Sequence, residues 1–98
     1  MNVRNNIVAH GAVDKWVPLY SRDDTLPPPF SFGFRYEYTR RRGPIELKII
    51  RGEEEQRITL TPDMLNEIFQ CGTTPIDKIY VRGLTRPAPS MRFTIRYS

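Results

Sequence analysis

The sequence predicts an all-β protein: an antiparallel β-sandwich, jelly-roll-like, or a small barrel of six to eight short strands, with at most one short helix near 62–70. Two alternating segments and regularly spaced turns predict it. Aromatic rings occupy every second position of one segment, at Phe30, Phe32, Phe34, Tyr36 and Tyr38. The last segment, 91–98, alternates strictly between apolar and polar residues. Because neighbouring side chains of a strand point to opposite faces, each segment has one apolar face.

The opening segments are weaker strand candidates. Residues 3–9 and 12–20 contain apolar residues without strict alternation, and Trp16 is the expected core anchor of the second. Pro18 predicts an edge position there, since proline cannot donate a ladder hydrogen bond. The segment 21–29 ends in three prolines and is expected to be a rigid loop.

The middle of the chain predicts three successive strands at 31–40, 44–51 and 56–61, which would form a meander. A short helix is expected near 62–70, because Thr61 can cap it, Pro62 suits its first position, and Gly72 follows as a stop signal. The same residues are also compatible with a single turn that crosses between two sheets. A further strand is expected at 76–84, before the alternating segment.

The length of 98 residues predicts one domain, 1–98, with residues 1–11 as a flexible N-terminal arm. No apolar run is long enough to span a membrane. The first residues lack the apolar core of a secretion signal, so export by that route is not expected.

The chain offers few residues for catalysis. Cys71 is the only cysteine and His10 the only histidine, which excludes an internal disulfide and argues against cysteine- or histidine-rich metal sites. No nucleophile elbow, phosphate-binding glycine loop or metalloprotease motif occurs. The adjacent acids Asp23 and Asp24 lie in a polar turn, where nothing raises their pKa for acid catalysis. We therefore expect no enzyme activity, no cofactor and no metal.

Two charged blocks stand out in a chain of net charge +4: Arg40, Arg41 and Arg42 in one turn, and Glu53, Glu54 and Glu55 in another. Charged turns can simply keep a β-protein soluble and protect its edges. Alternatively, they are contact points. In a meander the two turns lie at opposite ends, roughly 23 Å apart for a seven-residue strand, which favours head-to-tail contacts between copies. Arg92 and Arg96, on the polar face of the last strand, are further candidate contacts.

Binding of single-stranded nucleic acid is the alternative function. Exposed aromatic residues beside basic ones form the stacking platform of several small β-domains. The candidate platform comprises Phe30, Phe32, Phe34, Tyr36 and Tyr38 together with Arg35. The competing interpretation places these rings in the core, because a chain of this size needs their apolar area there.

The closing half, CGTTPIDKIYVRGLTRPAPSMRFTIRYS, resembles small β-sandwich structural proteins of tailed bacteriophages and other virions, of the cement, head-completion or spike-base type. A Gly-Thr-Thr stretch precedes a strand that ends in Gly-Leu, and an alternating strand follows. The resemblance implies a non-enzymatic virion component, made in the host cytoplasm, whose partners are capsid or neighbouring subunits and further copies of itself. If the protein is not viral, a cytoplasmic location is expected.

Overall fold

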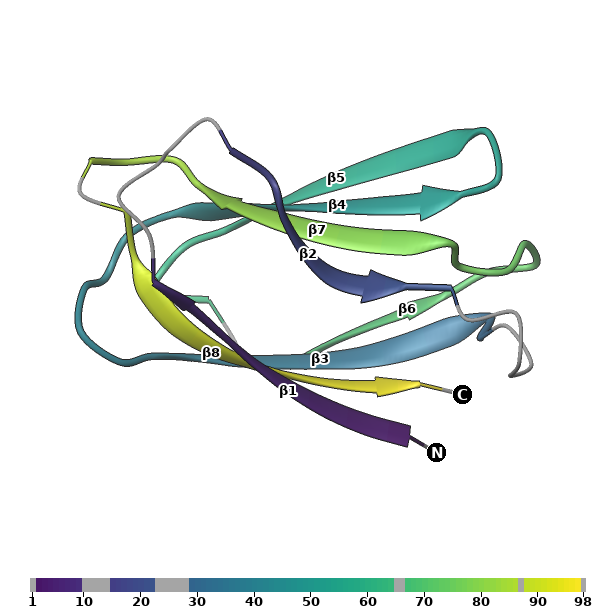
Figure 1. Cartoon of the computed structure of the whole chain (residues 1–98), viewed down its shortest axis with the longest axis horizontal. Helices are drawn as coiled ribbons and strands as arrows, with labels where there is room; N and C mark the ends of the chain where they lie inside the picture. The colour runs from purple at the N-terminus through teal and green to yellow at the C-terminus, as the bar shows by residue number, and fades with distance from the viewer. Residues whose placement is uncertain (1, 10–14, 23–28, 65–66, 87, 98) are drawn as a thin grey trace.

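The computed structural model describes residues 2–9, 15–22, 29–64, 67–86 and 88–97. Its strands form two four-stranded antiparallel sheets that face each other, which confirms the predicted antiparallel β-sandwich (Figure 1). The strands are β1 (Asn2–Ala9), β2 (Val17–Ser21), β3 (Ser31–Tyr38), β4 (Ile45–Arg51), β5 (Glu54–Leu60), β6 (Glu67–Cys71), β7 (Lys78–Gly83) and β8 (Ser90–Tyr97).

The strands pair in a nested way. Sheet A has the order β1-β8-β3-β6 and sheet B the order β2-β7-β4-β5. The first strand therefore pairs with the last, the second with the seventh, the third with the sixth, and the fourth with the fifth. Because the partners are distant in sequence, most of the sheet depends on long-range contacts. Figure 1 shows the two ends of the chain side by side, where β1 starts and β8 finishes.

The aromatic stripe of β3 lies inside the sandwich. Phe32, Phe34 and Tyr36 are buried, and the Phe34 ring lies 5.0 Å from that of Phe93 in the neighbouring strand β8. Tyr38, at the end of the strand, is half-buried, and its ring meets that of Tyr36 edge-on at 6.0 Å. The exception is Phe30, which precedes the strand and is 45% exposed.

Sheet B supplies the other side of the core through alternate residues of β4, β5 and β7. The predicted alternation of β4 is confirmed, because Ile45, Leu47 and Ile49 are buried. The core contains the following buried side chains: Leu19, Phe32, Phe34, Tyr36, Ile45, Leu47, Ile49, Leu60, Ile76, Ile79, Val81, Met91, Phe93 and Ile95. The edge position predicted from Pro18 is also confirmed, since β2 is an outer strand of sheet B.

Three local predictions differ from the structure. The meander is wrong, because β3 belongs to sheet A and β4 to sheet B, so only β4 and β5 form a hairpin. No helix runs through 62–70: residues 62–63 form a turn, and 67–70 belong to β6, which pairs with β3; residues 65–66 lie outside the described residues. The turn carries the chain from sheet B to sheet A. Residues 2–9 of the expected arm form β1, which pairs with β8 throughout, and residues 1, 10 and 11 lie outside the described part.

No helix in the described part of the chain is long and apolar enough to cross a membrane.

Candidate interaction surfaces

The three arginines lie on the 39–44 connection, which crosses from β3 to β4 at one end of the sandwich (Figure 1). Backbone hydrogen bonds hold this connection: the Thr39 amide donates to the Ser90 carbonyl at 2.8 Å, and the Ser90 amide donates to the Arg41 carbonyl at 3.2 Å. All three arginines are exposed, and none of them forms an ion pair with another described residue. We call Arg40, Arg41 and Arg42 the arginine end.

Tyr38 anchors this connection from the core side. Its hydroxyl donates a hydrogen bond of 2.6 Å to the Gly43 carbonyl. Burial raises the pKa of the Tyr38 phenol, the neighbouring Tyr36 raises it further, and the charge of Arg42 lowers it. Burial, followed by the charge of Asp63, also raises the pKa of Tyr36. Both phenols are therefore neutral at physiological pH, and the charge at this end comes from the arginines.

The glutamates lie at the opposite end of the long axis, on the hairpin between β4 and β5 (Figure 1). Arg51 pairs with Glu54, which leaves Gly52 and Glu53 as the two loop residues. Gly52 has φ +60°, and no described non-glycine residue has positive φ, a pattern typical of a type II′ turn. All three glutamates are exposed, and only Glu55 forms an ion pair, at 2.9 Å to Arg57. We call Glu53, Glu54 and Glu55 the glutamate end.

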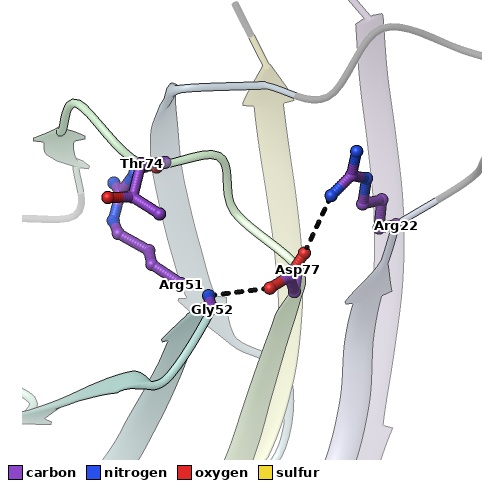
Figure 2. A network of polar contacts seen from close by, with 5 residues as sticks. All are labelled: Arg22, Arg51, Gly52, Thr74 and Asp77. Carbon is purple, nitrogen blue, oxygen red and sulfur yellow. Dashed lines mark hydrogen bonds and ion pairs between the residues drawn. The ribbon is translucent and has the colours of Figure 1, made fainter.

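Two side chains stabilise the base of that hairpin (Figure 2). One Asp77 carboxylate oxygen accepts a hydrogen bond of 2.7 Å from the Gly52 amide, and the other accepts one of 3.4 Å from Arg22. The buried guanidinium of Arg51 donates from Nη1 to the carbonyls of Thr74 at 2.7 Å and Phe30 at 2.9 Å, while its Nη2 has no hydrogen-bond partner among the described residues. These contacts join the hairpin to the residue after β2, to the residue before β3 and to the loop before β7.

The remaining predicted contact residues lie on β8 rather than at either end. The exposed Arg92 is on the outer face of sheet A, opposite Glu37, with which it forms an ion pair of 3.3 Å. Arg92 therefore already has an acidic partner within the molecule. Arg96 belongs to the same strand, but its side chain lies outside the described residues. The structure thus keeps the residues of each block next to one another. It separates the two blocks from each other and from Arg92.

A third surface, on the outer face of sheet B, was missed by the sequence analysis. Trp16 was expected in the core, but it is half-buried on this face, where three cationic side chains lie close to its indole ring. Lys48 Nζ lies 4.4 Å from the indole centroid, and the guanidinium carbons of Arg82 and Arg57 lie 4.5 and 5.6 Å away. Lys48 Nζ is also 4.9 Å from the Tyr80 ring. The alternation of polar and apolar residues in these strands indicates that Lys48, Arg57 and Arg82 face outward. The sequence does not give the order of the strands in the sheet, which brings these residues together.

The aromatic platform predicted on β3 is wrong for its central rings. Phe32, Phe34 and Tyr36 are buried, so their faces cannot stack on bases. Tyr38 is half-buried, while Phe30 and Arg35 are exposed at different points of the sheet. The core interpretation of the stripe is the one that the structure supports.

No group of three acidic, histidine or cysteine side chains that could hold a metal ion occurs among the described residues. His10, Asp23 and Asp24 lie outside them. Cys71, at the end of the edge strand β6, is exposed and free.

A scan against models of known protein families finds no match, and no curated protein matches the chain significantly. Among solved structures, the fold is similar to that of a protein from Bacillus endospore appendages, which form a novel family of disulfide-linked pili. The two agree with a TM-score of 0.57 and 13% identity, over 99% of this chain and 87% of the other. At this identity the similarity shows the fold alone. The structural neighbour is a pilus protein and not a virion protein, so the virion resemblance stays a hypothesis.

Proposed function

We propose that this protein is a non-enzymatic structural subunit that assembles with copies of itself, head to tail, through the arginine end of one copy and the glutamate end of the next. One observation carries the proposal. Opposite charges are concentrated at opposite ends of the long axis, and all six side chains are exposed. Among the described residues, only Glu55 of the six has an ion-pair partner. Such an arrangement attracts unlike ends and repels like ends.

The geometry of the ends suits a repeating contact. The molecule measures 36 Å along its longest axis, and a contact between its two different ends is heterologous, so it continues into a ring or a filament. The backbone of each end is held by the hydrogen bonds described above, so less conformational entropy is lost on binding than for a free loop. Apolar surface near the ends has to supply part of the affinity, since charges mainly determine specificity.

The fold supports the same function. The nested pairing of β1 with β8, β2 with β7, β3 with β6 and β4 with β5 supports a jelly-roll interpretation of the sandwich, and jelly rolls occur in viral capsid proteins. The similar pilus protein has a comparable fold, and its name says that it builds appendages. We therefore propose a particle or filament as the setting, with a minor, capsid-associated virion component as the more specific hypothesis.

Charge exchange tests the head-to-tail contact. A variant with Arg40, Arg41 and Arg42 changed to Glu carries acidic residues at both ends, and a variant with Glu53, Glu54 and Glu55 changed to Arg carries basic residues at both. Each variant alone should sediment as a monomer at concentrations where the wild type assembles. An equimolar mixture should assemble again, because unlike ends are restored.

A matched control separates the contact from net charge. The chain has three lysines, Lys15, Lys48 and Lys78, so Lys→Ala at all three removes the same charge as Arg→Ala at the arginine end. The arginine variant should weaken association roughly 5- to 100-fold, from about 1–3 kcal/mol for three exposed charge pairs. The lysine variant should assemble like the wild type. Equal effects of both variants, or no rescue in the mixture, would contradict the proposal.

A further inference from the structure

The outer face of sheet B carries two partly exposed rings around one ammonium group. Lys48 Nζ lies 4.4 Å from the centroid of Trp16 and 4.9 Å from that of Tyr80. Lys48 and Tyr80 are directly opposite each other on β4 and β7. The rings therefore flank a positive charge on a sheet surface, outside the core.

The same face has a surplus of positive charge. Arg82 is paired with Glu46 at 2.8 Å, Arg57 with Glu55 at 2.9 Å, and Arg22 with Asp77 at 3.4 Å. Lys48 and Lys78 have no ion pair with any described residue. Lysine is a compact, strongly hydrated charge, so these two ammonium groups are available to an anion on this surface.

A hollow adjoins the Tyr80 ring, and both of these lysines line it. It is open to solvent, and it is lined by Ser21, Arg22, Lys48, Ile50, Gly52, Asp77, Lys78 and Tyr80. The register places Lys78 at the hairpin side and Arg82 further along the same strand, beyond Tyr80. The glutamate end would repel an anion. An anionic ligand that follows β7 from the hollow toward Trp16 moves away from that end.

We propose that this face binds single-stranded nucleic acid, with bases stacked on Tyr80 and on the exposed part of Trp16, and with phosphates at Lys48 and Lys78. Aromatic side chains beside a positively charged groove bind single strands with little sequence preference, because every base has a π-face. A nucleic acid and the glutamate end of a second copy are both negatively charged, but only the nucleic acid has rings that can stack on Tyr80 and Trp16, which favours it as the ligand. This inference does not depend on the proposed assembly.

The only tryptophan of the chain lies in the site, so its fluorescence reports binding directly. Titration with a ten-nucleotide oligothymidylate at low salt should quench Trp16. With two phosphates neutralised, the logarithm of the binding constant should fall with the logarithm of salt concentration with a slope of about −1.4. Tyr80→Leu should weaken binding roughly 5- to 100-fold, which corresponds to the loss of one stacked base.

Matched variants make the test decisive. Ala at Lys15, Lys48 and Lys78 should bring the salt slope toward zero, whereas Ala at the arginine end, with the same loss of charge, should leave binding unchanged. Thermal melts verify that each variant is folded. Inorganic polyphosphate, which lacks bases, should bind more weakly and be insensitive to Tyr80→Leu.

Three results would overturn the proposal: no quenching at low salt, equal weakening by the arginine variant, or polyphosphate that binds as tightly as the oligonucleotide. A change in Trp16 fluorescence that depends on protein concentration alone would assign the face to a second copy instead. Loss of head-to-tail assembly, measured by sedimentation, leaves these readouts unaffected, so failure of one proposal is distinguishable from failure of the other.

Discussion

Asp77 offers a direct test of how the glutamate end is held in place. One of its oxygens accepts a hydrogen bond of 2.7 Å from the Gly52 amide, and the other accepts one of 3.4 Å from Arg22 (Figure 2). The first bond is short and holds the loop of the hairpin. The second is a long ion pair between two partly exposed side chains, which in general contributes about 0–1 kcal/mol. The two bonds therefore predict unequal losses.

Asp77→Ala removes both bonds, and Asp77→Asn keeps one acceptor for the Gly52 amide. A hydrogen bond to a charged group is worth about 1.5–3 kcal/mol when shielded, and partial exposure places this one near the lower value. We expect Asp77→Ala to lower the free energy of unfolding by about 1.5–2.5 kcal/mol. Asp77→Asn and Arg22→Ala should each lower it by less than about 1 kcal/mol.

Urea unfolding and thermal melts measure these differences. For a domain of this size, 1 kcal/mol shifts the midpoint by about 4–8 °C, so Asp77→Ala should lower it by roughly 6–20 °C. Arg22→Ala is the matched control, since it removes the ion pair and leaves the Gly52 bond intact. If Asp77→Asn and Asp77→Ala destabilise equally, the bond to Gly52 does not hold the hairpin and the reasoning is wrong.

Three further perturbations test the turn, the core and the tyrosines. Gly52→Ala should lower the free energy of unfolding, measured in urea, by about 1–2 kcal/mol. The loss comes from backbone strain at φ +60° and not from a clash, since the nearest side-chain atom to a new Cβ is 3.8 Å away. An unchanged midpoint would contradict the assigned turn. Phe34→Ala should cost about 3–5 kcal/mol, as expected for a fully buried ring, and a loss under 1 kcal/mol would place that ring outside the core. Because the pKa of Tyr36 and of Tyr38 is raised in the folded state, the stability that their neutral phenols contribute is complete below pH 10 and is lost as the pH rises through the folded-state pKa. A series of urea midpoints at increasing pH should show this loss. An unchanged midpoint above pH 10 would contradict it.

Periodicity predicted which faces are buried because that information is local. The alternation of β3, β4 and β8 identified core residues such as Phe34, Leu47 and Phe93. It did not identify partner strands, since a strand shows the same alternation whether its neighbour in sequence lies beside it or in the facing sheet. The connection 39–44 passes from one sheet to the other, so the predicted meander is wrong at that step. The two charged turns nevertheless lie at opposite ends of the molecule, as predicted.

Two other differences have equally local causes. Ile68 and Phe69 fit a helical face, but β6 pairs with β3 opposite Phe34 and Gly33, and this pairing outweighs a weak helical preference. Trp16 was assigned to the core by its size. Val17 is paired with Val81 and packs against the core, so the preceding residue is directed to the outer face of the sheet. A shift of one residue thus converts a core anchor into a surface ring, and single-sequence periodicity has no means to detect it.

The burial of the β3 rings has a consequence for function. Because Phe32, Phe34 and Tyr36 of the stripe are in the core, their rings are not available to a ligand, and charge and the rings on the outer face of sheet B are the candidate means of recognition. Arginines lie at one end, and two lysines line the hollow beside Tyr80. Two variants of equal net charge therefore address different surfaces. The arginine-end variant should lose assembly and keep Trp16 quenching, and the lysine variant should do the reverse. If both variants lose both properties in parallel, net charge alone determines binding, and neither surface is a specific site.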